Sequence, residues 1–274
     1  MTPLTHPMSA GPAAQASHPA DQPGAMSTMF AIKSALRRDM LRKLRGVSQD
    51  QLEGQSQAVF RVLQQQPFYK NARTVGCYLS MQKGELRTTH IVQDLLSSGK
   101  KLYTPYLPPA ATASSDKSIK SDQAKTPKTL DEDHEPGSEN PLMEMLRLYT
   151  NEDLEQCPLD KWGILDPGLR RFDVDEQREN VFDAGADDLD LILLPGVAFD
   201  DECNRLGRGK AYYDRFLHRY TTARKRPLLI ALALTPQILP LGEKIPTTPN
   251  DFRLDGVVSP VGVVMREVKD ASES

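Results

Sequence analysis

The chain has 274 residues, a formal net charge of −3, and a hydrophobic fraction of 39% that is low enough to suggest that part of it is not packed. This length suits one α/β domain of about 200 residues with appendages, or two small domains. No apolar run approaches the roughly 18 residues that a membrane span requires. The three cysteines lack CxxC spacing, which argues against a disulfide framework or a zinc site.

The N-terminal segment, residues 1–28, is rich in Pro, Ala, Ser and Gly and contains no Lys or Arg. A mitochondrial presequence is amphipathic and Arg-rich, so we expect a disordered tail and a cytoplasmic protein. Met26 or Met29 as an alternative start leaves a mitochondrial location open. The first helix is expected at residues 31–45, where Gly46 stops it. Lys33 and Arg37 are four residues apart on this helix and share one face, which is usually just the solvated side. The apolar stripe beside them consists of Ile32, Leu36, Met40 and Leu44.

Helices and strands alternate along the rest of the chain. Ser48 and Gln51 form a capping box, which predicts a second helix that runs to about Gln65. A third helix is expected at residues 88–98. Because strands alternate with helices, we expect an α/β domain with a mainly parallel sheet. Strands are predicted at 74–79, 101–106, 142–149, 189–194, 227–234 and 254–258, the last being the final strand.

Residues 108–140 contain only two members of the set Leu, Ile, Val and Phe, namely Ile119 and Leu130. Such a segment cannot bury enough apolar surface to offset the entropy of ordering it, so we expect a disordered insertion. A compact domain tolerates this because the cost of closing a loop grows only logarithmically with its length. Residues 172–190 hold eight acids and one Arg, which disfavours nucleic acid nearby.

The segment after residues 189–194 is typical of an anion site. Pro195 and Gly196 end the strand, and residues 204–210 then contain two glycines and three long cations before a helix begins. Glycines allow close approach of the backbone, and the free amides at a helix start favour phosphate. Residues 205–226 hold eight cations against one acid, so the charge is local and a small anion is the expected ligand. Gly-Arg-Gly-Lys alone would still be best interpreted as an ordinary loop with solvated charges.

The longer string is far more specific than this loop. Residues 204–214, Asn-Arg-Leu-Gly-Arg-Gly-Lys-Ala-Tyr-Tyr-Asp, with residues 194–200, Leu-Pro-Gly-Val-Ala-Phe-Asp, resemble the signature of the 5-formyltetrahydrofolate cyclo-ligases, also called methenyltetrahydrofolate synthetases. Residues 80–88, 161–167 and 249–255 resemble other parts of that family. The resemblance implies a Rossmann-like single domain over residues 30–268, interrupted by the insertion at 108–140.

The resemblance also implies the residues of a site. The expected ATP contacts are Lys33, Arg37, Asn204, Arg205, Leu206, Gly207, Arg208, Gly209, Lys210, Ala211, Tyr212 and Tyr213. Arg208 and Lys210 would be catalytic, because their place in the loop puts them nearest the transferred phosphoryl group. Glu85, Trp162 and Tyr212 or Tyr213 would form the folate pocket, although a lone Trp is more often a core anchor. Asp214 and Asp251 would hold Mg²⁺, with Asp255 a weaker candidate.

The implied reaction closes 5-formyltetrahydrofolate to 5,10-methenyltetrahydrofolate at the expense of ATP. The expected partners are ATP, Mg²⁺ and a folate, with neither nucleic acid nor a membrane, and the protein is expected to be a monomer. One alternative is a non-catalytic nucleotide- or RNA-binding protein on the same fold, and another is a sugar-phosphate or CoA-handling enzyme. The intact signature, together with Lys33, Arg37 and Glu85, weighs against both.

Overall fold

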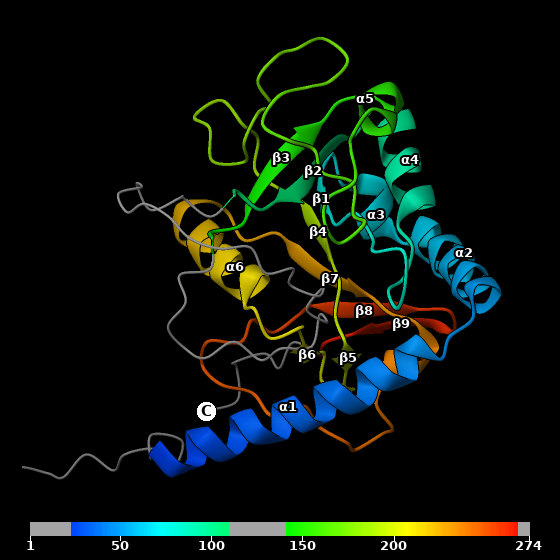
Figure 1. Cartoon of the computed structure of the whole chain (residues 1–274), viewed down its shortest axis with the longest axis vertical. Helices are drawn as coiled ribbons and strands as arrows, with labels where there is room; N and C mark the ends of the chain where they lie inside the picture. The colour runs from blue at the N-terminus through cyan, green and yellow to red at the C-terminus, as the bar shows by residue number, and fades with distance from the viewer. Residues whose placement is uncertain (1–22, 110–140, 268–274) are drawn as a thin grey trace, which may run out of the picture.

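The apolar runs of the sequence pair into one large sheet (Figure 1). The computed structural model describes residues 23–109 and 141–267. The seven strands lie in the order β3-β2-β1-β4-β7-β8-β9, with β3 and β9 antiparallel at the two edges and parallel pairing between them. This confirms the predicted α/β fold with a mainly parallel sheet. The strands are β1 (Thr74–Cys77), β2 (Lys101–Tyr106), β3 (Glu144–Leu148), β4 (Leu191–Leu194), β7 (Leu228–Leu232), β8 (Gly256–Ser259) and β9 (Gly262–Met265).

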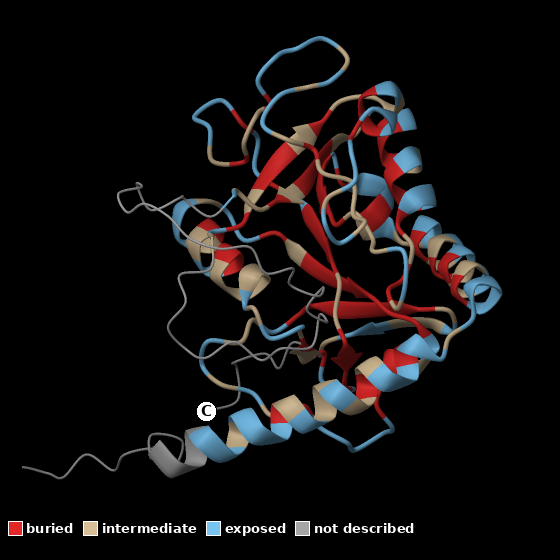
Figure 2. Cartoon of the chain, viewed as in Figure 1, coloured by how far each residue is buried: buried red, intermediate tan, exposed pale blue. Residues whose placement is uncertain are grey.

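Helices cover both faces of this sheet, which explains why its central strands are apolar almost throughout. In β4, Leu191 and Leu193 belong to a core shared with α2, α3 and α4, whereas Ile192 and Leu194 belong to a second core shared with α6. Figure 2 shows the central strands buried and the outer sides of these helices exposed. The helices are α1 (Pro23–Arg45), α2 (Gln49–Gln65), α3 (Pro67–Asn71), α4 (Thr89–Ser97), α5 (Asn151–Glu155) and α6 (Tyr212–Ala223).

A short hairpin between β4 and α6 forms a third core with α1. The hairpin consists of β5 (Ala198–Phe199) and β6 (Arg205–Leu206), which pair antiparallel. Met40 of α1 is buried against Val197, Ala198 and Leu206. In Figure 1, α1 runs along one edge of the molecule beside this hairpin. Helix α1 therefore packs onto the hairpin through Met40, whereas Leu44 near its C-terminal end joins the core of the main sheet.

Most predicted elements are present, and four differences are informative. The capping box of Ser48 and Gln51 starts α2 as predicted. Helix α1 begins at Pro23, inside the expected tail of residues 1–28, because proline is well tolerated in a first helical turn. The strand expected to be the last, at 254–258, is followed by β9, which returns through a tight turn where Gly262 has a φ of 141°. The hairpin and the short helices α3 and α5 were not predicted.

Two predictions lie outside the described residues. These are most of the N-terminal tail, residues 1–22, and most of the insertion, residues 110–140. Within the described ranges, no helix combines the length and apolar character needed to cross a membrane.

Candidate active site

The glycine-rich loop between β6 and α6 has an unusual backbone. Gly209 has a φ of 91°, and Ala211, which precedes the first residue of α6, has a φ of 52°. Left-handed conformations are uncommon for residues with a Cβ and are concentrated at functional sites. A Cβ on Gly209 would lie 3.3 Å from Cζ of Arg37, so glycine there allows close approach between the loop and α1.

The two cations predicted on the N-terminal helix reach this region. Arg37 Nε donates to the carbonyl oxygen of Gly207 over 2.9 Å. Lys33 is buried, and its Nζ lies 2.5 Å from Oδ2 of Asp251. The structure therefore brings together α1, the glycine-rich loop and the segment before β8, which are far apart in the sequence.

Arg205 and Asp214 form a bidentate ion pair across the loop. Arg205 Nη2 lies 3.0 and 2.9 Å from the two carboxylate oxygens of Asp214. The Arg205 guanidinium lies over the ring of Tyr213 at 5.5 Å, and the backbone N–H of Phe252 donates to Asp214 as well. Arg205 Nε is buried and has no hydrogen-bond partner within the described residues, which leaves a donor unsatisfied at the site.

Glu85 faces the same loop from the segment after β1. Its carboxylate is buried, accepts from the Met81 backbone N–H over 2.9 Å, and lies 4.0 Å from Nε of Arg208. Burial raises the pKa of Glu85 above its ordinary value, although the Arg208 charge and the Met81 N–H oppose the shift. The two catalytic candidates differ in their contacts, because Lys210 makes no ion pair or hydrogen bond with a described residue.

Trp162 lies in a separate surface loop and is 37% exposed. Asp160 fixes the turn by accepting from the Trp162 backbone N–H over 2.8 Å, and the Lys161 ammonium lies 4.3 Å from the Trp162 ring centre. The next residue, Gly163, adjoins Gln82 closely enough that a Cβ there would lie 3.5 Å from the Gln82 amide carbon. The Trp162 loop thus touches the loop that carries Glu85, and the exposed indole is not a core anchor.

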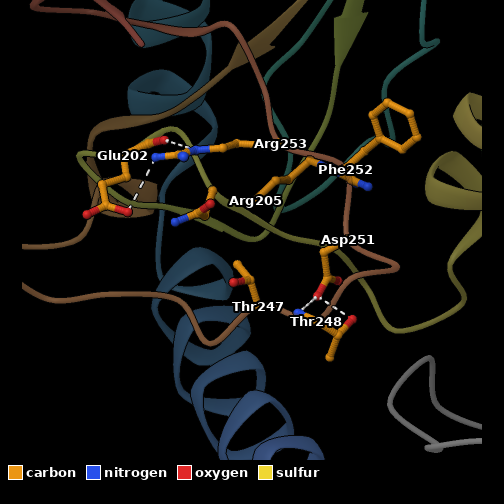
Figure 3. Close-up of a pocket in the computed structure, with 8 residues that line it drawn as sticks. Glu202, Arg205, Thr247, Thr248, Asp251, Phe252 and Arg253 are labelled. Carbon is orange, nitrogen blue, oxygen red and sulfur yellow. Dashed lines mark hydrogen bonds and ion pairs between the residues drawn. The ribbon is translucent and has the colours of Figure 1, made fainter. Parts of the chain in front are cut away.

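A pocket of about 220 Å³ lies between the hairpin and the segment before β8 (Figure 3). Asn204, Arg205 and Asp251 were predicted site residues that line it. Among the other lining residues, Phe252 and Arg253 belong to the stretch 249–255 that resembles the family but were given no role, and the rest carried no motif. The full set of other lining residues is Glu202, Thr247, Thr248, Phe252 and Arg253.

Comparison with known proteins identifies the family of the chain. The sequence model of the 5-formyltetrahydrofolate cyclo-ligase family matches residues 30–260. The chain belongs to that family. It is 32% identical to the mitochondrial 5-formyltetrahydrofolate cyclo-ligase of Arabidopsis thaliana over 87% of this chain and 78% of that one. It is 31% identical to the mouse 5-formyltetrahydrofolate cyclo-ligase over 84% and 95% of the two chains.

A solved structure from the family shares the fold. The methenyltetrahydrofolate synthetase of Aquifex aeolicus superposes with a TM-score of 0.57 at 24% identity, covering 88% of this chain and 98% of that one. The chain is thus a ligase of the cyclo-ligase family, and the resemblance found in its sequence is confirmed.

Asp251 and Asp214, the two carboxylates predicted to hold a metal ion, are not equally suited to that role. Asp251 accepts three hydrogen bonds on Oδ2, from Lys33 Nζ and from the N–H and hydroxyl of Thr248. Its Oδ1 has no hydrogen-bond partner among the described residues. Burial would raise the pKa of Asp251, but Lys33 and Thr248 hold it below its ordinary value. Both oxygens of Asp214 are already occupied by Arg205.

No group of three or more potential ligands lies together within the described ranges. Mg²⁺ in phosphate-handling sites uses one or two carboxylates, with the substrate phosphates and water completing its shell. The Oδ1 oxygen of Asp251 therefore fits the role of a single carboxylate ligand for Mg²⁺. Asp214 fits that role only if Arg205 moves away from it.

The remaining predicted ATP contacts differ in which of their atoms a ligand could reach. The Leu206 side chain is buried in the core with Met40, so only its backbone is available to a ligand. Tyr212 is half-buried beneath the Arg215 guanidinium, which lies 5.7 Å from its ring centre. Burial raises the pKa of Tyr213 well above its ordinary value.

Proposed function

We propose that the chain converts 5-formyltetrahydrofolate to 5,10-methenyltetrahydrofolate with ATP and Mg²⁺, releasing ADP and phosphate. The observation that carries the proposal is the double contact of the glycine-rich loop. On one side Gly207 accepts from Arg37, a predicted ATP residue, and on the other Arg208 faces Glu85, a predicted folate residue. A loop between the two proposed ligands suits a transfer from one to the other.

The chemistry explains why the reaction requires a nucleotide. The formyl oxygen on N5 belongs to an amide and is a very poor leaving group. In the proposed reaction this oxygen attacks the γ-phosphorus, the bond from that phosphorus to the β-γ bridging oxygen breaks, and ADP leaves. N10 then attacks the formyl carbon, the carbon–oxygen bond breaks, and phosphate departs as N10 loses its proton to solvent.

The positive side chains have separable roles in this scheme. Lys33, Arg37 and Arg205 would bind the triphosphate. Arg208 and Lys210 would neutralise the transferring phosphoryl group, together with the free backbone amides at the start of α6. Phosphoryl transfer depends mainly on positioning and charge neutralisation, which agrees with a site rich in cations.

The acidic and aromatic side chains complete the site. Asp251 would hold Mg²⁺ through Oδ1, with Asp214 as the second candidate, and the ion would neutralise charge on the phosphate oxygens. Glu85 would bind a polar edge of the folate, because a buried carboxylate needs a donor. Trp162 and Tyr212 or Tyr213 would supply flat surfaces for the pterin ring.

The direct test is an absorbance assay for the methenyl product, with 5-formyltetrahydrofolate and Mg-ATP as substrates. We expect product only when both ATP and Mg²⁺ are present. Lys210→Ala should reduce turnover by roughly 100-fold or more, because it removes a cation directed at the transferring group. Lys225→Ala is the matched control, because Lys225 is an exposed lysine beyond the opposite end of α6.

Two results would count against the proposal. Product formation without ATP would remove the role of the triphosphate. A wild-type chain that binds Mg-ATP but forms no product would indicate the non-catalytic nucleotide-binding alternative.

A further inference from the structure

Asp200 is a buried carboxylate beside the pocket whose role the sequence did not indicate. It is 4% exposed and follows β5 directly. Its Oδ1 accepts from the backbone N–H groups of Glu202 and Asn204 over 3.0 and 2.9 Å. Its Oδ2 accepts from Nδ2 of Asn204 and the backbone N–H of Ile245 over 2.9 and 3.0 Å. All four hydrogen bonds are directed at one carboxylate.

These donors belong to the two opposite walls of the pocket. Glu202 and Asn204 line one wall, which is the hairpin turn. Ile245 immediately precedes the segment that supplies Thr247 and Thr248 to the other wall. Asp200 therefore fixes the separation of the walls, since a hydrogen bond from each side ends on its carboxylate.

The turn that carries Asn204 also needs this support. Cys203 has a φ of 61°, a conformation that costs free energy in a residue with a Cβ. Its backbone N–H donates to the carbonyl oxygen of Asp200 over 3.1 Å. Hydrogen bonds to Asp200 on both sides of Cys203 thus hold the strained turn in the form that directs Asn204 and Arg205 to the pocket.

We propose that Asp200 is a positioning residue for nucleotide binding, which acts through Asn204 and through the segment 245–248 without touching the ligand. This inference rests on the proposed function, because it takes the pocket as part of the nucleotide site. The position needs a side chain with two acceptor oxygens, since all four groups that face it are donors. An Asn at position 200 has one acceptor oxygen and one NH₂ group. In either orientation its NH₂ group would face one pair of donors, and that pair of hydrogen bonds would be lost.

The test compares Asp200→Asn with the wild-type chain by calorimetric titration of Mg-ATP and by steady-state kinetics. We expect the Kd for Mg-ATP to rise roughly tenfold or more, because buried donors lose their acceptor. We expect the KM for 5-formyltetrahydrofolate to change less than about twofold, since the folate residues lie on other loops. A general loss of structure would raise both.

Asp190→Asn is the matched control for lost stability. Asp190 also accepts from backbone N–H groups, those of Arg73 and Thr74, but it lies at the start of β4, at the opposite end of that strand from the hairpin. We expect this variant to unfold at a lower temperature while keeping the wild-type Kd for Mg-ATP. An unchanged Kd in Asp200→Asn, or equal losses for nucleotide and folate, would overturn the positioning role.

A measurement on the wild-type chain covers the case in which Asp200→Asn does not fold. Mg-ATP should slow hydrogen exchange at the amides of Asn204 and Ile245 together, because both depend on the same carboxylate. Slowing at neither amide, or at only one, would overturn the inference. If the wild-type chain does not bind Mg-ATP, both this inference and the proposed function fail, whereas binding with an unaffected Asp200→Asn variant refutes this inference alone.

Discussion

At the scale of single residues, both carboxylates predicted to hold a metal ion are already paired with predicted cations. Lys33 lies 2.5 Å from Asp251, and Arg205 holds both oxygens of Asp214. Removing one member of a buried ion pair leaves an uncompensated charge and is strongly destabilising. These side chains are therefore constrained by their partners before any ligand binds, and substituting one of them disturbs both.

The buried carboxylate of Glu85 lowers the stability of the fold, although it is the group proposed to bind folate. Burial raises the pKa of its carboxyl above the ordinary value of 4.5, so the folded chain binds a proton at Glu85 more tightly than the unfolded chain does. The free energy of unfolding then falls as pH rises from about that value through the higher pKa of the folded chain. We expect Glu85→Gln to be more stable than the wild type at pH 8, with the difference vanishing below the ordinary pKa of 4.5.

Chemical unfolding of both chains across this pH range would check the prediction. The amide of Glu85→Gln can still accept from the Met81 backbone N–H, so packing is nearly unchanged. A stability difference that does not depend on pH would show that the Glu85 carboxylate is not penalised by burial. The same variant should have a weaker affinity for folate, because the substituted group lacks the charge proposed to bind it.

At the scale of elements, the hairpin depends on a close contact that only glycine permits. A Cβ on Gly196 would lie 2.4 Å from Cζ of Phe199, whose side chain is fully buried. The ring cannot move aside without displacing the core. Because β5 begins two residues after Gly196, this contact fixes how the hairpin leaves the main sheet.

Gly196→Ala should therefore destabilise the fold by about 1–3 kcal/mol, as overpacking of a core does. Gly54→Ala is the matched control, because Gly54 lies within α2 and a Cβ there would meet nothing within 4 Å. That substitution should stabilise the chain by about 0.5–1 kcal/mol through helix propensity. Thermal unfolding of both variants checks the pair, and a Gly196→Ala variant as stable as the wild type would contradict the packing argument.

The elements that could be predicted are those whose pattern is local. Strand β4 and helix α2 have an apolar run and a capping box, and both occur where expected. Strand β9 could not be recognised because it is a short edge strand, with Val264 and Met265 about half exposed. The hairpin strands β5 and β6 have two residues each, too few for any periodicity, and they form through contacts with α1.

At the scale of the whole molecule, the site is assembled from segments that are distant in sequence. Helix α1 supplies Lys33, the loop after β1 supplies Glu85, and the segment before β8 supplies Asp251. Periodicity and composition did not predict that these residues lie in one site. Only the resemblance to the family predicted it. Asp200 ends the signature string 194–200, but the resemblance implied no role for it, because that role depends on a backbone N–H at Ile245 that folding brings to it.

A buried ion pair supports the loop that carries Trp162. Arg178 and Asp153 are fully buried and bidentate, at 2.5 and 2.6 Å. Arg178 also donates to the carbonyl oxygen of Pro167 over 2.7 Å, at the end of the loop that carries Trp162. In the sequence Arg178 is the one Arg among the eight acids of residues 172–190, and such a context gives no sign of burial.

The most direct measurement follows the formyl oxygen itself. The chain would be given 5-formyltetrahydrofolate labelled with ¹⁸O in the formyl group, together with Mg-ATP, and the released phosphate analysed by mass spectrometry. Because the proposed reaction transfers the γ-phosphoryl group to that oxygen and then breaks the carbon–oxygen bond, we expect one ¹⁸O in each phosphate and one ADP for each methenyl product. Methenyl product accompanied by unlabelled phosphate would contradict the account.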